Sequence, residues 1–459
     1  MPETHPARPR AVLVGVQVPE VSDLEHATHL AELRRLVNTL GYETVATVSQ
    51  RRAGTGAGTV LGSGKLKELA DLTGGPGVVA SGAADRTSKA RERWEAEAAE
   101  EDEPAEAAEE EGGAPAVMAG ERATVVVVAH ELSPSQLRNL EKATGALVLD
   151  RTGVIVDIFH RHARSREARM QVEIARLKYL APRLRESAGR SERQAGRGAG
   201  DSAVELDRRK IRDRIAELNA GIAAVQQEQD HRRHARRDQL RVALVGYTNA
   251  GKSSLMRALT GSEVLVADKL FATLDTTVRA LQPESRPRVL VSDTVGFLRQ
   301  LPHDLVASFR STLDEALEAS LLLYVVDASD PTCEAQLEVT RSVLRDIGAT
   351  DVPSLLLLNK VDRLDEAARR ELKTRFPGAI QLSAHAPGDV ASLRQAILDF
   401  FEAQMVEAEL RIPYASQGRI GEVYEAARVL SENYDETGRS VRVRSTPGAI
   451  ARLVRAFPG

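Results

Sequence analysis

The stretch Leu240–Ser254 reads LRVALVGYTNAGKSS and decides the class of fold. Its apolar first half predicts a buried strand that ends at Gly246. Gly251, Lys252 and Ser253 follow after four residues, which completes the spacing G-x-x-x-x-G-K-[ST] of a phosphate-binding loop between a strand and a helix. A chance glycine-rich turn is the alternative, and the complete spacing in this context disfavours it.

Each part of this loop has a physical role in holding a polyphosphate. The glycines let the backbone approach the phosphates closely, and successive N–H groups with the following helix N-terminus form an anion cradle. Lys252 supplies a charge to the β- and γ-phosphates, and the Ser253 hydroxyl is placed to ligate Mg²⁺. The residues expected to contact the nucleotide here are Gly246, Tyr247, Thr248, Asn249, Ala250, Gly251, Lys252, Ser253 and Ser254.

Two further motifs concern the γ-phosphate and the metal. Asp293-Thr-Val-Gly296 follows an apolar run, so Asp293 is expected to hold Mg²⁺, usually through water, and the Gly296 N–H to meet the γ-phosphate. Thr273, in the segment LFATLD, is the expected switch threonine that completes the Mg²⁺ shell. Thr276 and Thr277 compete for that role. Lys252, Thr273 and Gly296 are therefore the predicted catalytic residues.

The base is predicted from Asn359-Lys360-Val-Asp362, which follows the apolar run SLLLL. A carboxylate at Asp362 can accept hydrogen bonds from the N1–H and the exocyclic amine of guanine, and adenine offers no matching pair of donors. Asn359 and Lys360 are expected to pack the loop and the base. Ser383, Ala384 and His385 follow the last predicted strand, where a backbone N–H can reach the guanine O6. The ordered set of motifs resembles the translation-factor class of GTPases.

Two residues bear on the rate of hydrolysis. Phe297 stands where many GTPases carry a glutamine that orients the attacking water, so we expect slow intrinsic hydrolysis and an activator. Groups supplied by such activators contribute about 10³–10⁵ in rate. Asn249 is a candidate K⁺ ligand, because an asparagine at this point of the loop binds K⁺ in a subset of GTPases. A purely loop-stabilising asparagine is the equal alternative.

Length and composition place the protein in a broad class. A chain of 459 residues suggests about three domains, and 42% hydrophobic residues can form real cores. The single cysteine, Cys333, excludes a disulfide framework and fits a reducing compartment. The first residues lack an apolar segment typical of a signal peptide, and no apolar run approaches the ~20 residues that span a bilayer. We therefore expect a cytoplasmic protein without membrane insertion.

Composition and periodicity divide the chain into four parts. The expected parts are an α/β domain at 1–158, a basic antiparallel coiled-coil hairpin at 159–238, a G domain with a doubly wound, mostly parallel sheet at 239–405, and a small α+β domain at 406–459.

The first of these parts contains three notable segments. A Glu- and Ala-rich stretch at about 81–122 is expected to be a disordered acidic insertion. Val154–Ile158 is predicted to be a strand. The sequence GSGK, ending at Lys65, looks like a phosphate loop but is followed by Leu66 where Ser or Thr is required. We interpret it as a glycine-rich turn into a helix, with nucleotide binding as the lesser alternative.

The hairpin is predicted from two heptad seams, one from Met170 to Leu184 and one from Ile211 to Val225, with a glycine-rich tip between them. From 159 to 241 the chain has roughly 21 Lys and Arg against roughly 12 Asp and Glu, which suits a polyphosphate backbone. The alternative is an ordinary solvated coiled-coil face. The candidate RNA contacts are Arg190, Arg193, Arg197, Arg208, Arg209 and Lys210.

The motifs GYTNAGKS, FATLD and DTVGF, with the hairpin segment LDRRKIRDRI, resemble the HflX family of GTPases. The resemblance covers nearly the whole chain except the acidic insertion. It implies a monomer that binds GTP or GDP with Mg²⁺, docks on the large ribosomal subunit and its ribosomal RNA, and promotes ribosome dissociation or rescue under stress. The tip sequence GRGAGDSAVEL and the Thr276-Thr277-Val278 that follows FATLD depart from the usual family pattern.

Two other functions remain open from the sequence. One is a GTPase that assists assembly of the large subunit and splits nothing, which the altered tip slightly favours. The other is an ATP-dependent RNA remodeller that uses the N-terminal domain, with a regulatory G domain. The missing Ser or Thr after Lys65 disfavours the second.

Overall fold

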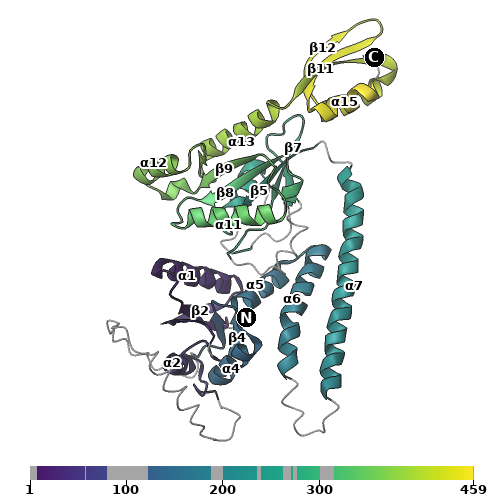
Figure 1. Cartoon of the computed structure of the whole chain (residues 1–459). Coiled ribbons are helices and arrows are strands. Elements are labelled where there is room, and N and C mark those ends of the chain that lie inside the picture. The colour runs from purple at the N-terminus through teal and green to yellow at the C-terminus, as the bar shows by residue number, and fades with distance from the viewer. Residues whose placement is uncertain are drawn as a thin grey trace, which may run out of the picture. The chain divides into compact units, whose positions relative to one another are not determined.

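The computed structural model describes residues 8–56, 58–79, 122–187, 200–234, 239–261, 270–271, 277–299 and 315–457 (Figure 1). The chain separates into two compact units, Met1–Ile155 and Val156–Gly459, and each is described by itself. Across these described ranges, no helix combines the length and the apolar character that crossing a membrane requires.

The first unit is built on a parallel four-stranded sheet in the order β2-β1-β3-β4. Its elements are β1 (Arg10–Gln17), α1 (Asp23–Thr39), β2 (Glu43–Arg51), α2 (Ser63–Thr73), β3 (Val125–Val128), α4 (Pro134–Thr144), β4 (Leu147–Asp150) and the start of α5 (Arg151–His162). The strands β1 and β3 are almost wholly buried, as expected for strands covered on both faces.

One prediction in this unit is wrong. Residues 154–158 belong to α5 rather than to a strand. The Asp150 carboxylate accepts the backbone N–H of Gly153 at 2.8 Å, which satisfies a free donor at the start of the helix. Val154, Ile155 and Val156 are consecutive buried residues, so apolar side chains lie on more than one side of the helix, and Asp157 alone interrupts the apolar run before Ile158.

The second unit opens with two long helices, α6 (Arg166–Ser187) and α7 (Gly200–His234), which lie side by side (Figure 1). Arg214 of α7 forms an ion pair with Glu173 of α6 at 2.8 Å, while Gly221 lies against Met170. A later residue of α7 therefore meets an earlier residue of α6, so the pair is antiparallel, as predicted. The tip between the two helices lies outside the described residues.

A six-stranded sheet in the order β10-β9-β8-β5-β7-β6 follows. It comprises β5 (Leu240–Gly246), β6 (Thr277–Ala280), β7 (Val289–Asp293), β8 (Leu321–Asp327), β9 (Ser354–Asn359) and β10 (Ile380–Gln381). All neighbours are parallel except β6 with β7, which confirms the mostly parallel doubly wound fold. The antiparallel edge strand β6 was not predicted. The associated helices are α8 (Lys252–Thr260), α11 (Cys333–Asp346), the short η2 (Val361–Arg363), α12 (Glu366–Arg375) and α13 (Pro387–Glu402).

The last part is a three-stranded antiparallel sheet in the order β11-β13-β12 with helices packed against it. Its elements are β11 (Val406–Pro413), η3 (Tyr414–Arg419), α14 (Ile420–Ala426), β12 (Arg428–Tyr434), β13 (Gly438–Ser445) and α15 (Pro447–Ala456). Val441 and Val443 are buried and Arg442 is exposed, as the alternation along this strand predicts.

Candidate nucleotide site

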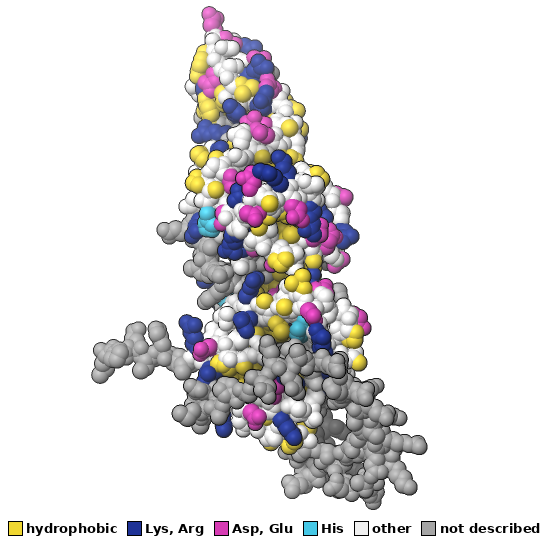
Figure 2. Space-filling view, turned by 90° about the vertical axis from the view of Figure 1, so that its left-hand side faces the viewer, with side chains coloured by type: hydrophobic (Ala, Val, Ile, Leu, Met, Phe, Trp, Pro, Cys, Tyr) yellow, Lys and Arg dark blue, Asp and Glu magenta, His cyan; other side chains and the backbone are white. Residues whose placement is uncertain are grey.

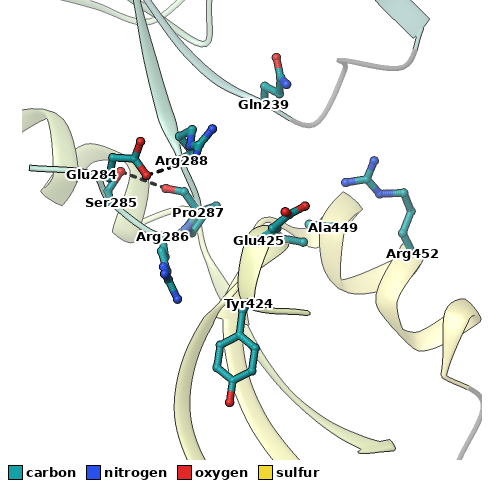
Figure 3. A pocket seen from close by; sticks show the side chains of 11 residues that line it. Gln239, Glu284, Ser285, Arg286, Pro287, Arg288, Tyr424, Glu425, Ala449 and Arg452 are labelled. Atoms are coloured by element: carbon teal, nitrogen blue, oxygen red, sulfur yellow. Dashed lines mark hydrogen bonds and ion pairs between the residues drawn. The ribbon is translucent and has the colours of Figure 1, made fainter. Parts of the chain in front are cut away.

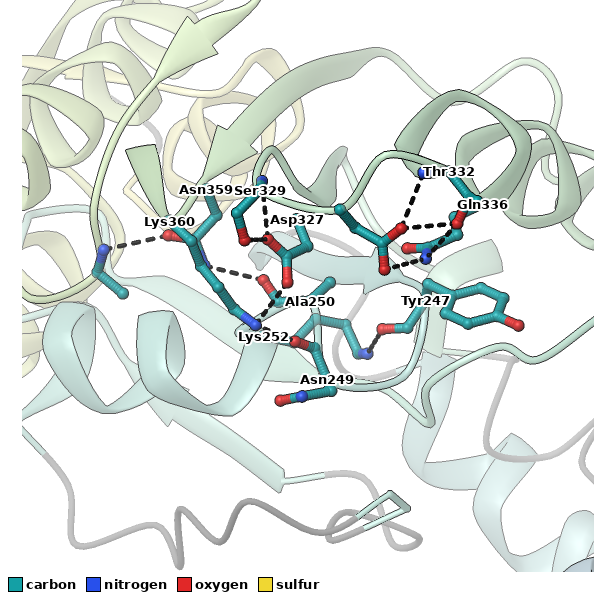
Figure 4. A network of polar contacts seen from close by, with 12 residues as sticks. Tyr247, Asn249, Ala250, Lys252, Asp327, Ser329, Thr332, Gln336, Asn359 and Lys360 are labelled. Atoms are coloured by element: carbon teal, nitrogen blue, oxygen red, sulfur yellow. Dashed lines mark hydrogen bonds and ion pairs between the residues drawn. The ribbon is translucent and has the colours of Figure 1, made fainter. Parts of the chain in front are cut away.

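The phosphate loop joins the end of β5 to the start of α8, as its sequence indicates. Gly251 caps α8 in a left-handed conformation with φ 96°, and a Cβ there would lie 2.1 Å from the Asn359 side-chain nitrogen. Only glycine fits this position. The Lys252 ammonium donates to the backbone carbonyls of Gly246 at 3.1 Å and Tyr247 at 2.8 Å, so its side chain folds back along the loop (Figure 4).

Lys252 is a buried cation in this loop, with 6% of its surface exposed. Burial lowers the pKa of its ammonium to about 8, against the opposing effect of the Asp293 carboxylate, and the charge of Lys360 lowers it further. Among the described residues, the hydrogen-bond acceptors for this ammonium are two neutral carbonyls, which balance its charge only in part. An anion bound in the loop would balance the remaining charge.

Ser253 and Asp293 meet at the other side of the loop. The Ser253 hydroxyl donates to the Asp293 carboxylate at 2.6 Å, which brings together the first turn of α8 and the end of β7. A hydroxyl and a carboxylate are hard oxygen donors of the kind that Mg²⁺ prefers. The two side chains therefore fit the predicted magnesium role, while Thr273 lies outside the described residues.

Backbone hydrogen bonds join the segment after Asp293 to the phosphate loop. The Thr248 N–H donates to the Phe297 carbonyl at 2.8 Å, and the Phe297 N–H donates to the Gly246 carbonyl at 3.1 Å. Between them, a Cβ on Gly296 would lie 2.8 Å from the Thr248 Cα and 3.0 Å from the Lys252 Nζ. Gly296 is therefore held close to the Lys252 ammonium.

The Phe297 side chain points into the protein core. It is 2% exposed and packs in a cluster with Ala243, Val245 and Leu322 of the central strands. A ring in this position cannot orient a water molecule at the phosphate loop, because its edge and faces are covered by apolar side chains.

The residues predicted to select guanine surround the same loop. The Asn359 amide donates to the Ala250 carbonyl at 2.8 Å, and its oxygen accepts the Ala384 N–H at 3.1 Å. Asn359 thus connects the phosphate loop to the segment after β10. Asp362 is exposed, and a hydrogen bond from Ser383 holds the pKa of its carboxyl below the usual range. The carboxylate therefore remains charged at neutral pH.

Asp327, at the end of β8, is a site residue that the sequence reasoning did not single out. Its carboxylate forms an ion pair with the Lys360 ammonium at 2.7 Å, and that ammonium also donates to the Asn249 carbonyl at 2.7 Å. Ser329 donates from its N–H and its hydroxyl to the other carboxylate oxygen of Asp327 (Figure 4). The sequence signal that could have identified Asp327 is an aspartate at the end of an apolar run, which is also the position of Asp293.

The remaining loop residues have distinct surroundings. Asn249 is exposed with φ 59°, and its carbonyl rather than its side chain contacts Lys360.

The Tyr247 hydroxyl accepts the Arg299 N–H at 3.0 Å. Thr248 is buried, and in the described chain its hydroxyl has no hydrogen-bond partner. Ala250 is buried, Ser254 is half-buried, and His385 is exposed.

The candidate RNA contacts are only partly described. Arg209 and Lys210 are exposed on α7, Arg208 is half-buried there, and Lys210 pairs with Asp207 at 3.1 Å. Arg190, Arg193 and Arg197 lie outside the described residues.

The glycine-rich turn before α2 differs from the phosphate loop in one decisive contact. Lys65 forms an ion pair with Glu68 of its own helix at 2.7 Å, whereas Lys252 folds back onto loop carbonyls. This geometry favours the interpretation of residues near Lys65 as a structural turn.

The strand–loop–helix cradle, together with the Asn-Lys-x-Asp loop on a doubly wound sheet, defines a P-loop GTPase. Three family models match the chain: GTP-binding GTPase N-terminal at 27–79 and 113–160, GTP-binding GTPase Middle Region at 162–236, and 50S ribosome-binding GTPase at 241–360. The chain belongs to the GTPase HflX family and hydrolyses GTP.

Among its relatives, GTPase HflX of Gluconacetobacter diazotrophicus is 69% identical over 457 residues, which cover 99% of both chains. GTPase HflX of Escherichia coli is 34% identical over 466 aligned positions, covering 99% of this chain and 98% of the relative. A GTP-binding protein from Sulfolobus solfataricus, solved in complex with GDP, is 22% identical with a TM-score of 0.43, covering 85% of this chain and 98% of that one.

Proposed function

We propose that this GTPase docks on the large ribosomal subunit in its GTP state and promotes dissociation or rescue of ribosomes under stress. The observation that carries the proposal is the match of its G domain to a family model described as a 50S ribosome-binding GTPase. The antiparallel helices α6 and α7, directly before that domain, support contact with ribosomal RNA through Arg208, Arg209 and Lys210, three consecutive cationic residues of α7, because clustered cationic side chains bind phosphate backbones. We expect the protein to act as a monomer in the cytoplasm.

In this proposal the phosphate loop, Lys252 and Gly296 bind the triphosphate, and Asp362 with the Ser383-Ala384 backbone binds guanine. Ser253, Asp293 and Thr273 would hold Mg²⁺, which when bound neutralises charge on the β- and γ-phosphates. The support is the convergence of Lys252, Ser253, Asp293 and Gly296 around one loop.

Intrinsic hydrolysis is proposed to be slow and to be stimulated by the ribosome. The support is the burial of Phe297, which leaves its position without a polar group to orient water. Asn249 is proposed as a K⁺ ligand, supported by its exposed side chain at the rim of the loop. Equal hydrolysis rates in KCl and NaCl would remove the K⁺ role and leave the rest of the proposal intact.

Sedimentation through a sucrose gradient tests the proposal directly. Whole ribosomes are mixed with the protein and a non-hydrolysable GTP analogue, and conversion into subunits is the expected result. Binding to free large subunits without conversion would instead indicate an assembly role. The absence of any ribosome association would contradict both functions.

Two variants make this experiment specific. Asp362→Asn should abolish conversion with the GTP analogue, because it removes the carboxylate that pairs with guanine. The triple change of Arg208, Arg209 and Lys210 to glutamate should leave GTP binding intact and weaken ribosome association, since these side chains lie on α7 rather than in the nucleotide site. Equal sedimentation of this triple variant and the wild type would exclude these three residues as contacts.

A further inference from the structure

Two adjoining cavities lie at the edge of the six-stranded sheet opposite the phosphate loop. They have volumes of about 550 Å³ and about 320 Å³, and both are lined by Ser285, Arg286 and Pro287 from the turn between β6 and β7. This turn precedes Val289, the first residue of β7, whereas Asp293 at the other end of β7 lies in the nucleotide site. At about 3.3 Å per residue, the cavities are on the order of 13 Å from that site.

The cavities are surrounded by parts of the chain that are distant in sequence. The larger one is bounded by the β6–β7 turn on one side and by α14 and α15 on the other (Figure 3). The smaller one extends over α13 and the start of β12. A ligand in them would therefore touch both the G domain and the C-terminal sheet domain. Volumes of 300–1,000 Å³ are typical of small-ligand sites.

Positive charge prevails in the lining. Five arginines and three glutamates line the two cavities, namely Arg286, Arg288, Arg394, Arg428 and Arg452 against Glu284, Glu402 and Glu425. By contrast, the surface in Figure 2 carries basic and acidic side chains interspersed over the described residues. The arginine excess in the lining would attract an anion.

Arg286 is the central residue, because it lines both cavities. It is exposed, and the described part of the chain provides it with no hydrogen bond or ion pair. Arg288 and Arg428, in contrast, pair with Glu284 at 3.2 Å and with Glu402 at 3.0 Å. Arg286 therefore has its full donor capacity available to a ligand.

Arg394 adds a donor that is already positioned. One terminal nitrogen donates to the Pro283 carbonyl at 2.8 Å, which ties α13 to the β6–β7 turn. Its Nε is buried and has no hydrogen-bond partner among the described residues. Because this Nε is shielded from solvent, a contact of Arg394 with a ligand in the smaller cavity would come from its terminal nitrogens, whose position is fixed by the bond to Pro283.

We propose that these two cavities bind phosphate groups, with Arg286 as the principal contact and Arg394 as a positioned second donor. Guanidinium groups match phosphate oxygens in pairs, and among the described residues that line either cavity every cationic side chain is an arginine. The phosphates can come from an RNA backbone or from a small polyphosphate. The proposal does not depend on ribosome binding, which can fail in sedimentation while this site still binds phosphate.

Binding is measured on the full chain saturated with GDP and Mg²⁺, so that the phosphate loop is occupied. Two probes are used. Calorimetry measures the binding of inorganic tripolyphosphate, and fluorescence anisotropy measures the binding of a labelled RNA hairpin. Arg286→Glu should weaken binding about tenfold or more, because it removes a charged donor and adds a repulsive charge. Arg370→Glu is the matched control, since Arg370 is an exposed arginine on α12 outside both linings.

The pattern of results identifies the source of the phosphate. Loss of RNA binding alone in Arg286→Glu indicates a nucleic-acid backbone, and loss of tripolyphosphate binding indicates a small polyphosphate. If Arg286→Glu melts at a lower temperature than the wild type, Arg286→Gln repeats the test, because it removes the positive charge without adding a negative one. The proposal is overturned if the wild type binds neither probe, if Arg286→Glu and Arg286→Gln bind like the wild type, or if Arg370→Glu loses as much affinity.

Discussion

Lys252 and Asp327 show how single side chains prepare the loop for a nucleotide. The Lys252 ammonium rests on two loop carbonyls in a buried position. Asp327 fixes a second ammonium, that of Lys360, against the Asn249 carbonyl. Both cations are thus positioned before a ligand arrives, which reduces the ordering that binding would otherwise require.

Asp327→Asn should lower the affinity for GDP and GTP by about tenfold, about 1.4 kcal/mol, because the Lys360 ammonium loses its charged partner in a site where both side chains are 15% exposed. Equilibrium titration with a fluorescent guanine nucleotide measures the change. Asp330→Asn serves as the control, since Asp330 binds Thr332 and Gln336 in a separate cluster. Unchanged affinity in Asp327→Asn would show that Lys360 is held by Asn249 alone.

Nucleotide affinity should fall as the pH rises above about 8, where burial places the Lys252 pKa. In the proposed site the phosphates bind the protonated ammonium, so above this pKa the free protein must take up a proton on binding. Between pH 7 and pH 8.8 the affinity should drop roughly sevenfold, and below pH 7 it should be constant with respect to this group. Calorimetry at pH 8 in buffers of different ionisation enthalpy should reveal proton uptake, and its absence would contradict the assignment.

Among the structural elements, the segment after β7 is joined most directly to the phosphate loop. Two backbone hydrogen bonds, from Thr248 to Phe297 and from Phe297 to Gly246, connect it to β5. The Phe297 ring then anchors the segment in the core. Because the backbone contacts need a residue in this position but no particular side chain, the ring contributes through packing alone.

Phe297→Gln should therefore fail to accelerate hydrolysis, although glutamine is the residue that many GTPases use. An amide placed in this apolar cluster loses packing and lacks partners, so the free energy of unfolding should fall by about 3 kcal/mol. Single-turnover hydrolysis and thermal melting measure the two effects. Phe297→Leu, which stays apolar, should lose less than about 1.5 kcal/mol. A faster Phe297→Gln variant would mean that this side chain can leave the core.

Elements of this fold were predictable from the sequence where an apolar run or a heptad period was present. The buried strand predicted to end at Gly246 is found as β5, and the apolar run SLLLL lies in β9. The strand predicted at 154–158 is wrong because three consecutive buried apolar residues, Val154 to Val156, hide the helical period in the sequence. The strand β6 has only four residues, three of them half-buried, and so carries little pattern.

The whole molecule combines a GTPase domain, a region at 159–238 in which Lys and Arg outnumber Asp and Glu, and an acidic segment of distinctive composition. The N-terminal family model matches 27–79 and 113–160 and omits the acidic stretch between them. The net charge of −4 is the sum of an acidic stretch at about 81–122 and a region at 159–238 in which Lys and Arg prevail, together with the rest of the chain.

Deletion of residues 81–112 should leave GTP hydrolysis unchanged, since the phosphate loop and guanine residues all lie after Leu240. It should raise RNA affinity severalfold at low salt, because a dense run of glutamates repels the phosphate backbone and competes for arginines. At high salt the difference should vanish through screening. RNA anisotropy at two salt concentrations tests this, with a Gly/Ser replacement of equal length as the control for chain length. Weaker RNA binding after deletion would contradict the prediction.

From the sequence alone, guanine-nucleotide binding could be predicted, because Gly251, Lys252, Asp293 and Asp362 stand at fixed spacings next to strands that local patterns reveal. The ion pair of Asp327 with Lys360, the burial of the Phe297 ring, and the place of Arg286 and Arg394 in adjoining cavities could be seen only in the folded chain. Those contacts join residues far apart in the sequence, and no local period encodes them. They arise where parallel strands end together and where separate elements pack against one turn.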